Sequence, residues 1–76
     1  MKSLVETIAK SLVDNPDEVS VREITDGGSE IIELRVAASD MGKIIGKQGR
    51  IVKAIRTVVK SAGAKQNRKI EVEVVS

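Results

Sequence analysis

Apolar side chains recur along this chain with two different periods, and the order of these periods limits the folds that it can adopt. A spacing of three or four residues over residues 2–13 predicts an amphipathic helix, and a second one is expected from Gly49 or Arg50 to Ala62. Alternating apolar and polar residues predict three short strands, over residues 19–24, 30–36 and 69–75. With a short helix over residues 40–45, the expected order is helix, strand, strand, helix, helix, strand.

Three helices and three short strands in 76 residues suit an α+β fold, a two-layer sandwich with the helices on one face of a small sheet. This length is near the lower limit for folding without a disulfide or a metal. No stretch has the composition of a linker, a repeat or a low-complexity segment. We therefore expect residues 1–76 to form a single, complete domain.

Short polar segments mark the expected ends of these elements. Asn15 precedes a proline, so the first helix should end near it. Asp26-Gly27-Gly28 is typical of a tight hairpin turn. Ser39 or Asp40 could cap the short helix, and Gly63 is suited to the position just after the end of the long one.

The missing residue types exclude several classes of function. Without Cys or His, the chain lacks thiolate and imidazole ligands for a metal and the usual nucleophile and general base of an enzyme. Without an aromatic residue, it cannot stack bases as many single-strand binders do. No apolar run approaches the roughly 18 residues of a membrane span. We expect a cytoplasmic protein that is not an enzyme, with no cofactor, no small-molecule substrate and no membrane partner.

Charge is distributed unevenly along the sequence. Met41 to Ile70 contains nine Lys or Arg residues and no acid, whereas the other residues contain four bases and all eleven acids. The net charge of +2 thus combines a segment of +9 with a remainder of −7. Such an excess of positive charge favours an anionic polymer as partner, and nucleic acid is the obvious candidate.

A four-residue turn, Gly46-Lys47-Gln48-Gly49, lies inside this basic segment. Its glycines allow the chain to reverse sharply and leave no Cβ to obstruct a close approach. A helix follows at once, so its free N–H groups and positive dipole end should be exposed there. A phosphate at this point would meet backbone donors, with Lys47, Arg50 and Lys53 nearby. An ordinary helix–helix turn would leave the clustered bases unexplained.

Residues 44–55, IIGKQGRIVKAI, resemble the signature of the KH domain, whose GXXG loop clamps a nucleic-acid backbone. The aliphatic Val52 stands where that family has one, three places after the second glycine. The expected order of elements is similar to the type II, prokaryotic KH arrangement, which implies a three-stranded mixed sheet. The segment 13–19, VDNPDEV, makes the chain resemble the small bacterial KhpA (YlqC) family.

This resemblance implies a cytoplasmic protein that binds single-stranded RNA with broad sequence tolerance, as an RNA chaperone or post-transcriptional regulator. It also implies a homodimer, a heterodimer with a second KH protein of the KhpB (Jag) type, or both. Bases would lie in a groove near Lys43, Ile44, Val52, Lys53 and Ile55, with the loop around Lys65 and Arg68 on its far side. Ile45 is expected in the core. The candidate RNA-binding residues are Gly46, Lys47, Gln48, Gly49, Arg50, Lys53, Lys43, Lys65 and Arg68.

Two other functions remain open from the residues alone. A KH fold could serve mainly for dimerisation or protein interaction, and Ile31 and Val75, on positions expected to face outward, leave room for such an interface. A DNA-binding KH module is the third possibility, because a phosphate clamp does not inspect the 2′-hydroxyl. Arg56 and Lys60 lie farther from the turn and are interpreted as a solvated helix face.

Overall fold

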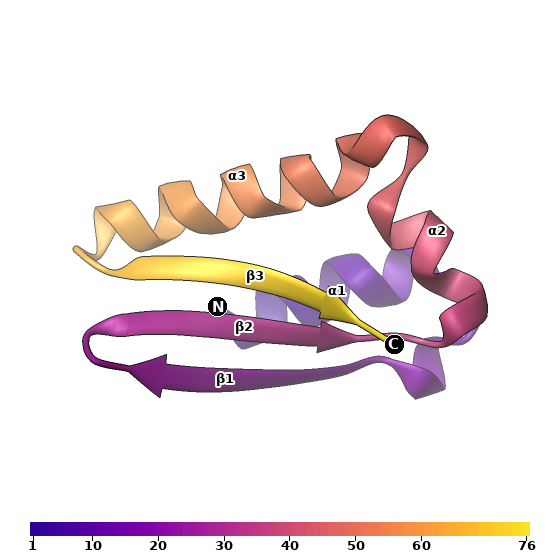
Figure 1. Cartoon of the computed structure of the whole chain (residues 1–76), viewed down its shortest axis with the longest axis horizontal. Helices are drawn as coiled ribbons and strands as arrows, with labels where there is room; N and C mark the ends of the chain where they lie inside the picture. The colour runs from indigo at the N-terminus through magenta and orange to yellow at the C-terminus, as the bar shows by residue number, and fades with distance from the viewer.

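The computed structural model describes residues 1–76 and contains one three-stranded sheet of order β1-β2-β3 (Figure 1). The strands are β1 (Ser20–Asp26), β2 (Ser29–Arg35) and β3 (Lys69–Val75). β1 pairs antiparallel with β2, whereas β3 pairs parallel with β2. The mixed sheet that the KH resemblance implies is thus confirmed, and the predicted strands end within two residues of the observed ones.

Three α-helices accompany the sheet: α1 (Lys2–Leu12), α2 (Met41–Ile45) and α3 (Arg50–Lys65). Single turns of 3-10 helix precede β1, α2 and α3, at Pro16–Glu18, Ala38–Asp40 and Lys47–Gly49 respectively. The α+β class and the order of elements are confirmed. None of these helices has the length and apolar character needed to span a membrane.

One face of the sheet forms the core with the helices. Alternate residues of β2 and β3 point into it, as the alternation predicted, whereas β1 contributes only Val21. The buried strand residues are Val21, Ile32, Leu34, Ile70 and Val72, and the helices add Val5, Ala9, Ile44, Ile55 and Val59. Burying a side chain of this size stabilises a fold by about 1.5–3 kcal/mol. The opposite face of the sheet is left open, as Figure 1 shows.

The end of α3 differs from the prediction. Gly63 lies inside the helix, which continues to Lys65, and the left-handed residue beyond the end is Asn67, with φ of 56°. Gly63 is needed for space: a Cβ there would lie 2.9 Å from the carbonyl oxygen of Arg68 and 3.1 Å from the side chain of Ile70. The prediction that α3 ends before Gly63 was wrong for two reasons. Asn also adopts the left-handed conformation found beyond the end of a helix, and glycine also occurs inside helices where packing is close.

The buried face of α3 is narrow. Val52, Ile55 and Val59 are buried, but Val58 is 47% exposed. Val58 therefore remains available on the surface of the molecule.

The hairpin between β1 and β2 was predicted correctly, since both Gly27 and Gly28 have positive φ.

Candidate nucleic-acid interface

The turn between α2 and α3 has a left-handed backbone at three of its four residues. Gly46, Gln48 and Gly49 have φ values of 76°, 58° and 73°. Two hydrogen bonds hold this conformation: the N–H of Gly46 donates to the carbonyl of Gly42 (2.9 Å), and that of Gly49 donates to Gly46 (3.2 Å). We call residues 46–49 the GXXG loop. A non-glycine residue is uncommon at positive φ, so the fold constrains Gln48 strongly.

The two glycines of the loop are required for different reasons. A Cβ on Gly46 would lie 2.5 Å from Cγ1 and 2.8 Å from Cβ of Ile51, whose side chain packs against the core. A Cβ on Gly49 would meet only the flexible end of Lys53, at 3.8 Å. Gly46 is thus fixed by both its φ and its contact with α3, whereas Gly49 is fixed by its φ alone.

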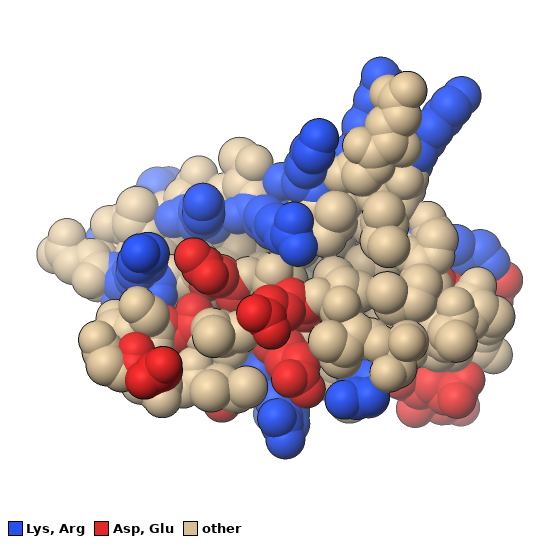
Figure 2. All heavy atoms as spheres, viewed as in Figure 1, with Lys and Arg blue, Asp and Glu red and all other residues tan.

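Cationic side chains surround the loop without acidic partners. Lys47 and Lys53 make no ion pair, and Arg50 donates only to the amide oxygen of Gln48, at 3.3 Å. Figure 2 shows basic side chains projecting into solvent where α2 meets α3. No side chain caps the first turn of α3, which begins at the loop. The loop therefore combines an uncapped helix start, a helix dipole and unpaired positive charge.

Lys43, another predicted site residue, is paired with acidic residues at the protein surface. Its ammonium donates a hydrogen bond to Asp14 and lies 3.9 Å from Oδ1 of Asp40. The hydrogen bond to Asp14 raises the pKa of Lys43, burial of the ammonium opposes this rise, and the charges of both carboxylates add to it. Lys43 thus ties α2 to the segment that follows α1.

Asp40 does not cap α2, contrary to the sequence-based expectation. Its carboxylate, only 1% exposed, accepts hydrogen bonds from the backbone N–H of Asp14 (3.2 Å) and of Asn15 (3.1 Å) and from the Asn15 amide (3.0 Å). Ser39 does not cap the helix either. Burial alone would raise the pKa of Asp40, but these three hydrogen bonds and the charge of Lys43 together lower it. Asp40 therefore links the start of α2 to the segment that follows α1 through buried hydrogen bonds.

Lys65 and Arg68 lie at the opposite end of α3 from the GXXG loop (Figure 1). Sixteen helical residues separate the two ends by about 24 Å. Arg68 is also paired with Glu30 of β2. Lys65 and Arg68 therefore lie far from the GXXG loop, and their contact with RNA stays a prediction.

The two isoleucines before the loop have the reverse of their expected roles. Ile44 is fully buried, whereas Ile45 is 38% exposed beside the loop. Adjacent helical residues point about 100° apart, so only one of the pair can face the core. Val52 and Ile55, expected to line the groove with Ile44, are buried as well.

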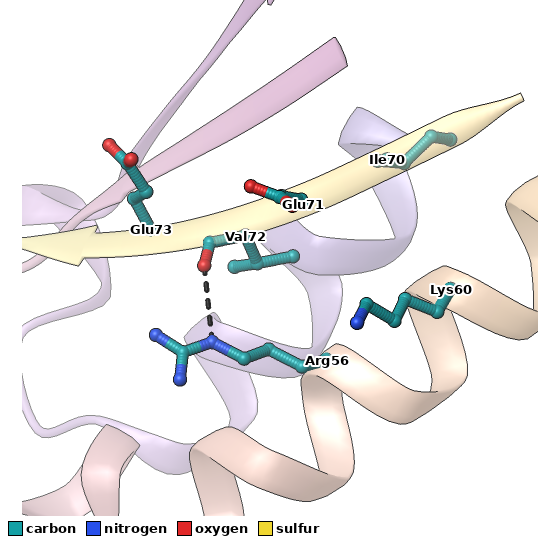
Figure 3. Close-up of a pocket in the computed structure, with 6 residues that line it drawn as sticks. All are labelled: Arg56, Lys60, Ile70, Glu71, Val72 and Glu73. Atoms are coloured by element: carbon teal, nitrogen blue, oxygen red, sulfur yellow. Dashed lines mark hydrogen bonds between the residues drawn. The ribbon is translucent and has the colours of Figure 1, made fainter. Parts of the chain in front are cut away.

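A groove of about 340 Å³ instead lies between α3 and the edge strand β3. Figure 3 shows its six lining residues: Arg56, Lys60, Ile70, Glu71, Val72 and Glu73. The Nε–H of Arg56 donates to the carbonyl of Val72 at 3.2 Å and so covers part of the strand edge. Sequence reasoning had set Arg56 and Lys60 aside. The sequence feature that could have identified them is the helical spacing of Lys53, Arg56 and Lys60, which places these three residues in one row from the loop to this groove.

The comparisons with known proteins agree with this geometry. The family model described as KhpA/KhpB, KH domain, matches residues 2–74. The chain belongs to this family. Its relatives include the RNA-binding protein KhpA of Clostridium acetobutylicum, 64% identical over 99% of this chain and 100% of the relative, and that of Clostridium perfringens, 61% identical over the same shares. The KhpA of Caldanaerobacter subterraneus subsp. tengcongensis is 60% identical over the same shares.

No solved structure matches this chain. The assignment to the KhpA/KhpB KH family confirms the resemblance inferred from the sequence and the prediction of a non-catalytic domain. The named relatives are bacterial proteins, as that resemblance implied.

The KhpA/KhpB-type fold also leaves an apolar groove of about 330 Å³ between α1 and α3. Leu12 of α1 and Val58 of α3 line it and are 36% and 47% exposed. Ile31 and Val75, the residues considered for an interface from the sequence, are only partly exposed on the open sheet face. Two of the four large apolar side chains that are exposed, Leu12 and Val58, thus lie in the α1–α3 groove.

Proposed function

We propose that this protein is a cytoplasmic RNA-binding protein that clamps the backbone of single-stranded RNA with its GXXG loop. It acts as an RNA chaperone or post-transcriptional regulator with broad sequence tolerance. One observation carries this proposal: a left-handed loop at the start of a 16-residue helix, surrounded by cations without acidic partners. The names of the relatives, RNA-binding protein KhpA, support the same function.

In the proposed complex, the loop and the first turn of α3 donate backbone N–H groups to one or two phosphates. Lys47, Arg50 and Lys53 supply the positive field around them. About four nucleotides occupy the surface beside the loop, as is typical of a GXXG clamp. No aromatic side chain is present to stack on the bases, so each domain binds weakly and with little sequence preference.

The test is a titration of labelled, mixed-sequence single-stranded RNA by fluorescence anisotropy at several salt concentrations. Neutralising three or four phosphates predicts a slope of log K against log salt of about −2 to −3. A flat salt response would contradict the phosphate clamp, and an absence of binding would favour a protein-interaction module. A parallel titration with DNA of the same sequence decides between RNA and DNA.

We also propose that two copies of the chain pair through the apolar α1–α3 groove, bringing two GXXG loops into one particle. Two linked sites raise the effective concentration of the second contact, which compensates for the weakness of each. The same groove is our proposed surface for a partner of the KhpB type, whose KH domain the family model also describes.

Light scattering tests the pairing. Val58→Glu places a charge in the groove and should yield a monomer. Thr57→Glu adds the same charge at the neighbouring exposed position of α3 and should remain a dimer. A wild-type monomer, or a dimer that survives Val58→Glu, would overturn the pairing without affecting the clamp.

A further inference from the structure

The apolar groove between α1 and α3 extends to the start of α3. Six of the seven residues that line it are apolar, and the seventh is Arg50, the first residue of that helix. Ile51, the next residue of α3, also lines the groove. The surface proposed for pairing therefore adjoins the GXXG loop proposed for RNA, and Arg50 belongs to both.

Ile51 connects the two surfaces through its side chain. A Cβ on Gly46 would lie 2.5 Å from Cγ1 and 2.8 Å from Cδ1 of Ile51, so this side chain lies directly against the backbone of the loop. The same side chain is partly buried and borders the groove. A partner that covers the groove restricts Ile51 and thereby holds the backbone of Gly46 more firmly. RNA then binds a loop whose ordering cost has already been met.

Arg50 connects them in a second way. Its guanidinium donates a hydrogen bond to the amide oxygen of Gln48 at 3.3 Å, while the residue also borders the apolar groove. Arginine side chains pack their methylene stems on apolar surface and keep the charged end in water. A partner packed on this stem limits the rotamers of Arg50 and keeps its guanidinium beside the loop, where a phosphate is expected.

Charge acts in the same direction. Lys47, Arg50 and Lys53 have no acidic partner, and Arg50 lies at the border of the pairing surface. Two copies that meet there bring like charges toward one another, which opposes association. Phosphates bound at the loops neutralise these charges. RNA should therefore favour pairing, just as pairing favours RNA.

We infer that pairing through the α1–α3 groove and RNA binding at the GXXG loop strengthen each other, with Arg50 and Ile51 as the positioning residues that couple them. This inference rests on the proposed function and names the regulation of its RNA site. It differs from the gain expected of two linked loops, because pairing raises the affinity of each single loop.

The coupling is reciprocal, so the two effects have a fixed relation. We expect pairing to raise the RNA affinity of each loop about fivefold, at the lower end of typical couplings between sites. Because a dimer contains two loops, saturating RNA should then lower the dimer dissociation constant by the square of that factor, about 25-fold.

The first test measures the dimer dissociation constant by sedimentation, with and without a labelled mixed-sequence tetranucleotide RNA. One GXXG clamp holds about four nucleotides, so this RNA is too short to bridge two loops. Anisotropy in the same samples establishes saturation. An unchanged or increased dissociation constant overturns the inference and leaves the proposed function intact. An RNA that does not bind contradicts the clamp, a protein that never pairs contradicts the pairing, and either result also overturns the inference.

Lys47→Asp/Gln48→Asp is the control for the route of the effect. These loop substitutions should abolish RNA binding, so the tetranucleotide should leave the pairing of this variant unchanged. An equal RNA-induced change in this variant would place the effect at another surface and overturn the inference.

The second test compares Ile51→Ala with Ile8→Ala. Both isoleucines are partly buried and line the groove, but only Ile51 contacts the loop. Both variants should pair more weakly, whereas the RNA-induced change in the dimer dissociation constant should fall below about fivefold only for Ile51→Ala. Equal changes in the two variants overturn the role of Ile51. Circular dichroism verifies the folds, and Ile51→Val with Ile8→Val replaces the pair if an alanine variant does not fold.

Discussion

The two ends of α3 are both basic in sequence, yet they differ in structure. At its start, Lys47 and Lys53 have no acidic partner and surround the uncapped first turn of the helix. At its end, Arg68 is paired with Glu30, and Gly63 is packed tightly against the chain that returns into β3. A run of bases in a sequence therefore overstates the available positive charge, because acids distant in sequence neutralise part of it in the fold.

The same contrast applies to the glycines at the two ends. Gly46 provides a left-handed turn and a close approach to Ile51, whereas Gly63 provides only a close approach. The first of these positions shapes the proposed clamp, and the second holds β3 against α3. Substitutions at the two ends should separate binding from stability.

The largest effect is expected for Gly46→Ala. The new methyl group would overlap Ile51 and the residue would keep a positive φ, so strain and overpacking together should cost about 3 kcal/mol. Urea denaturation measures this loss. Gly49→Ala, which meets only the φ penalty, should cost about 1–2 kcal/mol. Gly42→Ala in α2 has open space and no positive φ, so it should be neutral or stabilising, and equal losses at all three positions would contradict the account.

Gly63→Ala should be the next most damaging change. Its Cβ would lie 2.9 Å from the backbone oxygen of Arg68, which cannot move without shifting the start of β3. We expect a loss of about 2 kcal/mol, or a decrease in Tm of roughly 8–16 °C. RNA affinity measured well below that Tm should remain unchanged. A selective loss of RNA binding in a stable variant would contradict the separation of the two ends.

A smaller effect on RNA affinity distinguishes the cations at the two ends. Lys53→Ala should weaken binding severalfold and reduce the magnitude of the salt slope by about 0.7, the value for one phosphate contact on a single strand. Lys65→Ala removes an equal charge at the far end of α3 and should leave the slope almost unchanged. Anisotropy titrations across a salt series measure both, and identical slopes for the two variants would place the RNA along the whole helix.

The pH dependence of the free energy of unfolding should show the contribution of the buried hydrogen bonds that Asp40 accepts. Because the pKa of Asp40 is lowered on folding, its contribution is fully present above the ordinary value of 3.8 and is lost as the pH falls through the folded value. Asp40→Asn should therefore be destabilised at neutral pH and should lose less stability than the wild type between pH 5 and the acid range. Urea denaturation at several pH values measures this difference, and parallel curves would contradict it.

The periodic features of the chain were predictable and the individual contacts were not. The alternation in β2 and β3 and the glycines at 27–28 and 46–49 placed the sheet, the hairpin and the loop correctly, since each follows from local geometry. The ion pair of Arg68 with Glu30 joins residues 38 positions apart, and that of Lys43 with Asp14 joins residues 29 apart. No local pattern encodes such pairs. The choice between Ile44 and Ile45 for the core also depended on the exact rotation of a five-residue helix, which periodicity cannot fix.

The central claim is that the GXXG loop clamps RNA, and an anisotropy titration of Lys47→Asp/Gln48→Asp tests it most directly. Asp is tolerated at the positive φ of position 48, so circular dichroism should show an unchanged fold. Lys2→Asp/Ser3→Asp, at exposed positions of the first turn of α1, introduces the same charge change away from the loop. We predict at least about a tenfold loss of RNA affinity for the loop variant and a much smaller loss for the control. Equal RNA affinities for the two folded variants would contradict the clamp and place RNA on another surface.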